Sequence, residues 1–214
     1  MTRDADRVRV APKMSGTRPM TVHARTIRSP ATYQDVLDAP AGMVAELIRG
    51  ALHLQPRPRP RHARATSALT AKIGGPFDYD SDGPGGWVIL IEPELHLGHE
   101  VLVPDIAGWR RERLSALPDD VGIRMAPDWV CEVLLPSTRT YDLTEKRAIY
   151  AEHGVGWLWF VDPDARTLEA FSLETNGWRL IAALHDEAEV RTAPFEDIGF
   201  ALATLWSGPA AASG

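Results

Sequence analysis

The sequence is short of cysteine and of long apolar runs, and both shortages narrow what this protein can be. Cys131 is the only cysteine among 214 residues, which excludes an internal disulfide and a zinc site built from cysteines. No apolar run approaches the roughly 20 residues that span a bilayer, so no membrane helix is expected. The first ten residues, MTRDADRVRV, lack the apolar segment of a signal peptide. We therefore expect a cytoplasmic protein that does not bind membranes.

Several familiar catalytic motifs are also missing. The sequence contains neither a glycine-rich loop that cradles phosphates nor the nucleophile elbow of serine hydrolases. His96 and His99 lie near Glu94 but without a recognised zinc-binding spacing. We therefore expect these two histidines to be ordinary strand and loop residues.

Positive charge is concentrated at the N-terminus. Residues 1–28 carry a net charge of +5 in a chain whose total is −6, which leaves −11 for the remainder. A protein built to coat nucleic acid would not have this overall balance. We expect residues 1–28 to be a disordered arm, either a solvated tail or a nucleic-acid-binding arm. Residues 29–206 would form one domain, and residues 207–214 a flexible tail.

Hydrophobic patterning predicts many strands and few helices. The dipeptide Arg49-Gly50 and the tripeptide Thr175-Asn176-Gly177 each separate two alternating segments, which is typical of β-hairpins. Expected strands are 44–48, 51–54, 87–91, 94–97, 101–109, 129–135, 156–161, 167–173, 178–183 and 189–191, and expected helices are 32–37, 62–73 and a segment after Pro136. The pattern indicates an α+β (mixed α/β) fold, in which a central mixed β-sheet of five or six strands is flanked by helices on both sides.

Three acidic residues lie in or beside apolar strand segments. Glu46, Asp105 and Glu132 have apolar neighbours, and a buried carboxylate is costly unless it is paired or binds a metal. Oxygen ligands from different strands suit Mg²⁺ or Mn²⁺. Lys146 follows Asp142 by four residues on the expected helix, so the two share one face. Taken singly, a residue such as Asp105 is more often a turn or cap residue, and one such as Lys146 is more often a solvated helix residue.

The order of these residues carries more information than any one of them. Glu46 lies within AELIRG, Asp105 within VPD, and Glu132 within CEVLLPST. Lys146 and Tyr150 lie in DLTEKRAIY, which is followed by WLWFVDP. Over about residues 30–206 this series resembles the Uma-type (Uma2) bacterial endonucleases, a branch of the PD-(D/E)xK nuclease superfamily. The resemblance implies a restriction-endonuclease-like core and a Mg²⁺-dependent (or Mn²⁺-dependent) endonuclease that hydrolyses DNA phosphodiester bonds.

Roles for individual residues follow from the same resemblance. Asp105 and Glu132 would be metal ligands, and Glu46 a third catalytic acid. Leu134 stands where the superfamily has its lysine, so the catalytic lysine would be Lys146, supplied from the helix. Supporting or phosphate-binding roles are implied for His62, Asp142 and Tyr150. The basic residues Arg61 and Arg64 on either side of His62 are candidates for phosphate binding because of their charge.

Some of these roles have plain alternatives. His62 stands where a helix is expected to begin, so it would contact phosphate or merely cap the helix. The basic run Arg57, Arg59, Arg61, His62 and Arg64 would contact the DNA backbone or form a solvated loop stiffened by proline. Aromatic strands and an apolar C-terminal turn suggest a homodimer.

Two departures from the family pattern bear on activity. Arg49 stands where the family usually has Asp, and Leu135 where it has Ser. Both flank the expected site rather than supply ligands. The alternative to an active nuclease is therefore a nuclease-fold module without catalysis that serves in binding or interaction. Another metal-dependent phosphate ester hydrolase has no specific feature in its favour.

Overall fold

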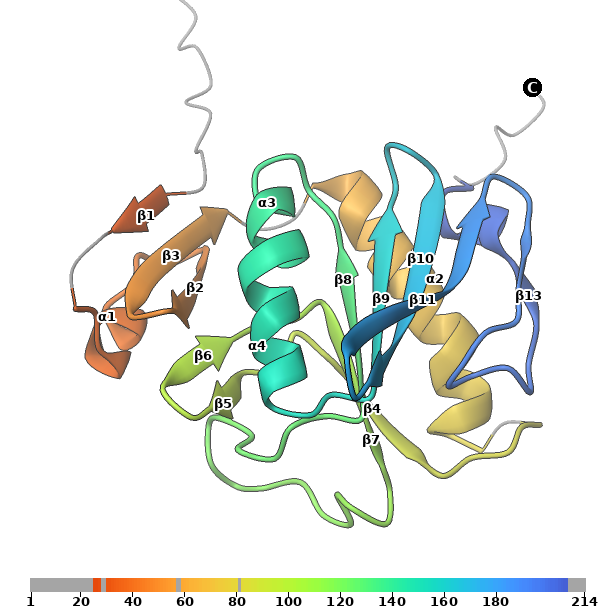
Figure 1. Cartoon of the computed structure of the whole chain (residues 1–214), viewed down its shortest axis with the longest axis horizontal. Helices are drawn as coiled ribbons and strands as arrows, with labels where there is room; N and C mark the ends of the chain where they lie inside the picture. Colours follow the sequence, from red (N-terminus) through yellow and green to blue (C-terminus); the bar gives the residue numbers. More distant parts are fainter. Residues whose placement is uncertain (1–24, 28–29, 57–58, 81, 208–214) are drawn as a thin grey trace, which may run out of the picture.

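The chain folds around two β-sheets that meet along one side (Figure 1). A computed structural model describes residues 25–27, 30–56, 59–80 and 82–207. The larger sheet has the strand order β11-β10-β9-β8-β7-β4 and the smaller one β1-β3-β2-β6-β5, while β12 and β13 form a separate pair. In this described part of the chain, no helix is long and apolar enough to cross a membrane.

The larger sheet is mixed, as expected. Its central pair, β8 (Trp129–Val133) and β9 (Trp157–Asp162), is parallel, and the other pairs are antiparallel. Every residue of β8 is buried, which is typical of a strand with neighbours on both sides and both faces covered. The remaining strands are β4 (Trp87–Ile91), β7 (Ile106–Arg110), β10 (Thr167–Glu174) and β11 (Gly177–His185). The predicted α+β class with a central mixed sheet is confirmed.

Helices cover the two faces of this sheet, and alternate residues of β8 point to them. Trp129, Cys131 and Val133 pack with the helix α2 (Pro60–Phe77), whereas Val130 packs with Ile149 of α4 (Arg147–Glu152). This alternation is the period of two of a β-strand. Glu132 therefore shares a face with Val130, toward the helical segment made of α3 (Arg139–Tyr141), η1 (Asp142–Lys146) and α4.

The C-terminal segment completes the hydrophobic core between α2 and the larger sheet. Phe195 is buried, and its ring centroid lies 4.8–5.7 Å from those of Phe77, Trp87, Trp129 and Trp159. Burying one such side chain stabilises a fold by about 1.5–3 kcal/mol. The surrounding elements are β12 (Glu189–Val190), β13 (Phe200–Ala201) and η2 (Leu202–Leu205). The C-terminal segment is thus part of the domain core.

The smaller sheet corrects two expectations. The predicted strand 101–109 divides at Pro104 into β6 (Glu100–Leu102) and β7, which belong to different sheets. Proline has no N–H for a sheet ladder, so the chain leaves one sheet there and enters the other. The acidic residues therefore come from two sheets rather than one. Besides β1, the smaller sheet also contains β2 (Met43–Ile48), β3 (Ala51–Pro56) and β5 (Leu95–Leu97), with α1 (Tyr33–Leu37) beside it.

The folded domain also begins earlier in the chain than the sequence predicts. Residues 25–27, which the sequence assigns to the arm, form β1 (Arg25–Ile27) and pair antiparallel with β3. Two side-chain contacts hold this strand, from Thr26 Oγ1 to Tyr141 Oη at 2.8 Å and to His53 Nδ1 at 3.2 Å. The other residues of the predicted arm, and residues 208–214 of the predicted tail, lie outside the described residues.

Candidate active site

Five of the predicted site residues line a small pocket at the seam between the two sheets and the α3–α4 segment. The pocket has a volume of about 30 Å³, which is enough for one or two water molecules. Its walls include His62, Asp105, Glu132, Asp142 and Lys146. Residues far apart in the sequence thus form one polar site.

Lys146 is the centre of this site. Its side chain is 2% exposed, and Nζ lies 2.8 Å from Glu132 Oε1, 3.0 Å from Glu46 Oε1 and 3.7 Å from Asp142 Oδ1. Burial by itself would lower the pKa of Lys146, but the charges of Glu132 and Glu46 outweigh it and raise that pKa well above its ordinary value. The side chain therefore stays an ammonium ion. The π-helical turn η1, a distortion often found at functional sites, carries it.

Glu132 is held from the same side by a tyrosine. Tyr150 is fully buried on α4, and its hydroxyl donates a 2.6 Å hydrogen bond to Glu132 Oε1. Burial raises the pKa of Glu132 well above its ordinary value, against the opposing charge of Lys146. Tyr150 thus orients the carboxylate that the resemblance assigns to a metal.

Glu46 and Asp142 complete the surroundings of Lys146. Glu46 Oε1 accepts the Val103 N–H at 2.8 Å, which ties β2 to the chain just before Asp105. Burial raises the pKa of Asp142 to about 6, while Thr138 Oγ1 donates a 2.8 Å hydrogen bond to its Oδ2. Three carboxylates therefore share one lysine.

Asp105 is held by α2 and by β8. Its Oδ2 accepts the Val133 N–H at 2.7 Å, and its Oδ1 lies 3.0 Å from His62 Nε2. Burial acts to lower the pKa of His62, but the hydrogen bond and charge of Asp105 raise it overall. His62 lies in the first turn of α2 with its ring toward Asp105, and Arg59 holds the N-cap position. The structure therefore places His62 in the pocket rather than at the helix cap.

The basic residues of α2 point in different directions. Arg61 Nη1 lies 3.5 Å from Asp164 Oδ1. Arg64 donates hydrogen bonds from Nε to the Ser207 carbonyl at 3.1 Å and from Nη2 to the Thr204 carbonyl at 3.4 Å. Arg64 is thus engaged by the C-terminal turn. Arg57 lies outside the described residues.

One acidic residue of the pocket escaped sequence analysis. Glu92 lines the pocket beside Asp105, and its N–H donates to the Asp105 carbonyl at 3.0 Å. Its backbone has a φ of 47°, a conformation that non-glycine residues rarely adopt. The available signal was the same as for Asp105, an acidic residue next to a strand.

A family model described as "Putative restriction endonuclease", Uma2, matches residues 30–204 of the chain. The chain belongs to the Uma2 family. A similar solved structure is that of a "putative nuclease belonging to DUF820" from Anabaena variabilis, with 21% identity and a TM-score of 0.67. The match covers 83% of this chain and 98% of that one, and it supports the same fold. No curated protein matches significantly.

The carboxylate oxygens around the pocket of this Uma2 chain are chemically suited to bind a divalent cation. Around the pocket, four buried or half-buried carboxylates face one ammonium ion and one histidine. Burial is the main reason that the pKa of Glu132 is raised, and the charges of the neighbouring carboxylates add to this rise against the opposing charge of Lys146. Among the residues that the structure describes, no three His, Cys, Asp or Glu side chains form a group that could hold a metal. Mg²⁺ requires fewer protein ligands than that, since it is commonly bound by one or two carboxylates together with waters and substrate phosphates. Asp105 and Glu132 are such a pair.

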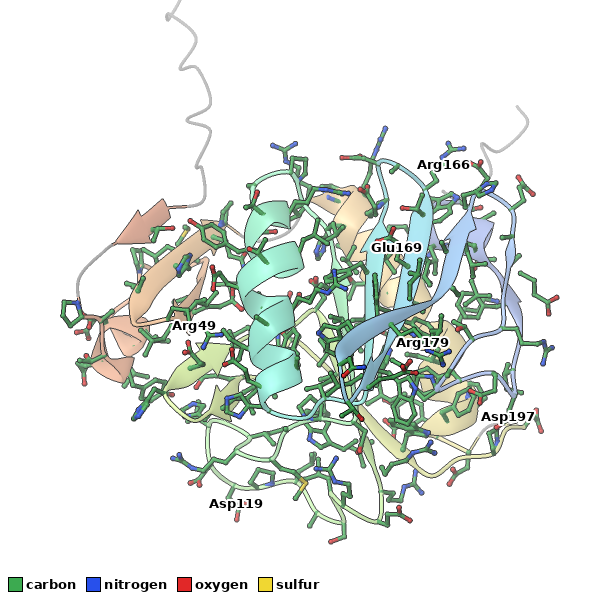
Figure 2. All side chains as sticks on the ribbon, in the orientation of Figure 1. Arg49, Asp119, Arg166, Glu169, Arg179 and Asp197 are labelled. Carbon is green, nitrogen blue, oxygen red and sulfur yellow. The ribbon has the colours of Figure 1, made fainter. Side chains whose placement is uncertain are left out.

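Arg49, one of the two departures from the Uma2 pattern, serves the scaffold. It lies in the β2–β3 turn with a φ of 51°, followed by Gly50 with a φ of 72°, as in a two-residue hairpin turn. Its guanidinium binds the carboxylate of Glu152 on α4 through two contacts of 2.8 and 2.5 Å. Figure 2 shows Arg49 between the smaller sheet and the helix. The pair links the strand of Glu46 to the helix of Lys146.

Breaking this pair should change stability little, because its side chains are 41% and 52% exposed. We expect a double-mutant cycle of Arg49→Ala and Glu152→Ala, measured by urea unfolding, to give a coupling free energy of roughly 0.2–1 kcal/mol. A coupling free energy well above that range would show that the Arg49–Glu152 pair is a main stabiliser of the two-sheet arrangement.

Removing the Tyr150 hydroxyl should have a larger effect on stability. We expect Tyr150→Phe to lower the free energy of unfolding by about 1–3 kcal/mol, because buried Glu132 loses a donor. The matched control is Tyr79→Phe, since Tyr79 is 73% exposed. Urea unfolding of both variants checks this, and equal stability of the two would contradict the orienting role of Tyr150.

Proposed function

We propose that this protein is a Mg²⁺-dependent endonuclease that hydrolyses phosphodiester bonds in DNA. The observation that carries the proposal is the position of Lys146, whose ammonium group from η1 lies between Glu132 of β8 and Glu46 of β2. Leu134, at the superfamily position for lysine, packs in the core instead. The helix thus supplies the cation that the strand lacks.

The carboxylates of Asp105 and Glu132 would hold the metal, which supplies an activated water and neutralises charge on the phosphate when bound. Tyr150 and Lys146 keep Glu132 oriented through its Oε1 atom. Lys146 would donate a hydrogen bond to the attacking water or to a phosphate oxygen, which stabilises the charge that develops in the transition state.

His62 has a separate role on the other side of the pocket. Its Nε2 atom lies 3.0 Å from Asp105 Oδ1, and the raised pKa of the ring favours the imidazolium form. Asp105 engages the Nε2 N–H, and Nδ1 is buried, so an imidazolium would act on the scissile phosphate through its positive charge rather than through a direct hydrogen bond.

The test is nicking of supercoiled plasmid DNA with Mg²⁺, with Mn²⁺ and with EDTA. We expect divalent-dependent nicking that is lost in Asp105→Ala. Robust cleavage by Asp105→Ala would refute the site. DNA or protein binding without turnover in either metal would favour the alternative of a nuclease-fold binding module.

A further inference from the structure

A second cavity adjoins the catalytic pocket. It has a volume of about 420 Å³, within the range of sites that bind small molecules. Its walls come from the start of α2 and from the segments that follow β8 and β9. Because β8 and β9 are parallel, both segments lie at the same edge of the sheet.

The two cavities share wall residues. His62 and Leu135 line both of them. His62 Nε2 lies 3.0 Å from Asp105 in the catalytic pocket. A group bound in the second cavity would therefore be adjacent to the proposed site of cleavage.

The walls combine an apolar side with a cationic one. The apolar surface comes from Leu134, Leu135, Pro136 and Pro163. A planar base can pack against apolar side chains of this kind. Arg59 and Arg61 stand at the start of the 18-residue helix α2, where free N–H groups also favour anions. Asp164 is the one acidic residue of this wall, and Arg61 pairs with it at 3.5 Å.

We propose that this cavity binds one nucleotide of the DNA strand, next to the bond that is cut. The inference rests on the proposed function. The base packs on Leu135 and Pro163, and its phosphate binds Arg59 and Arg61. Because the wall is apolar as well as cationic, the occupant is a nucleotide rather than a phosphate alone, and Leu135, which stands where the family usually has Ser, enlarges the apolar part.

The experiment measures binding without cleavage. A fluorescein-labelled DNA duplex is titrated with the full chain in EDTA, and deoxyadenosine monophosphate and inorganic phosphate serve as competitors. We expect Leu135→Trp, which places an indole in the cavity from a half-buried position, to weaken DNA binding about 10-fold. The Arg59→Ala/Arg61→Ala variant should weaken it similarly and reduce the salt dependence by about one to two phosphate contacts.

The matched control is Arg179→Ala. Arg179 is 63% exposed on β11 (Figure 2). It pairs with Glu174, as Arg61 does with Asp164. This variant should bind DNA like the unaltered protein. Thermal unfolding of all the variants separates loss of the site from loss of the fold.

Each outcome separates this inference from the proposed function. Unchanged DNA binding by folded Leu135→Trp overturns the nucleotide site, even if the protein cleaves DNA. Equal competition by phosphate and by the nucleotide also overturns it, because the base would then contribute nothing. Weakened binding by both variants supports the site, even if the unaltered protein shows no cleavage, in which case only the proposed function fails.

Discussion

Replacing Lys146 by Met should reduce DNA nicking by about 10²–10³-fold, the usual cost of removing one donor that stabilises transition-state charge. Met retains most of the side-chain volume and removes the ammonium group that lies between Glu132 and Glu46. The initial rate of plasmid nicking at saturating Mg²⁺ measures the effect.

The same variant should also be less stable. Without Lys146, the buried carboxylates lose their shared cation, and removing one partner of a buried ion pair costs about 3–5 kcal/mol. Combining Lys146→Met with Glu46→Gln removes one negative charge and should recover part of this loss without recovering cleavage.

Lys72→Met is the matched control, because Lys72 is exposed on α2. It should nick DNA at the rate of the unaltered protein. If the folded Lys146→Met/Glu46→Gln variant cleaved at an undiminished rate, Lys146 would have no catalytic role.

Replacing Glu132 by Gln should reduce nicking by about 10²–10⁴-fold, since a metal contributes several kcal/mol to stabilising charge in the transition state. The variant should keep its fold, because Lys146 retains Glu46 and Asp142 as partners. Calorimetric titration with Mn²⁺ should show weaker binding, which makes the result independent of turnover.

Glu100→Gln is the control for this experiment. Glu100 is also a buried acid, 9% exposed, but it accepts the Arg49 N–H at 2.7 Å and does not line the catalytic pocket. It should leave nicking and Mn²⁺ binding unchanged. Equal Mn²⁺ affinity in Glu132→Gln and the unaltered protein would remove Glu132 from the metal site.

The family and much of the secondary structure were predictable from local patterns. The strand at Trp87–Ile91 is found with the predicted bounds, and the hairpin around Asn176-Gly177 is confirmed. Such features depend on alternation and on turn residues a few positions apart, which are visible in the sequence. The two-sheet arrangement was not predictable, because the pattern of apolar residues through Pro104 continues from one sheet into the other.

Sequence alone determined which residue types are available to this protein: acidic residues beside apolar strands, one lysine on the following helix, and a histidine at the start of another. It also determined the order of motifs that identifies the family. Only the tertiary structure decided their partners. Glu132 meets Lys146 because alternate residues of β8 face opposite sides of the sheet, and Val130, Glu132 and α4 share one of them.

The same holds for the residues outside that cluster. His62 contacts Asp105, whereas Arg64, two residues further along α2, binds the carbonyls of Ser207 and Thr204. Arg49 proved to link the smaller sheet to α4. These contacts join residues up to 143 positions apart, and long-range pairs of this kind depend on how the sheets and helices pack rather than on any local pattern.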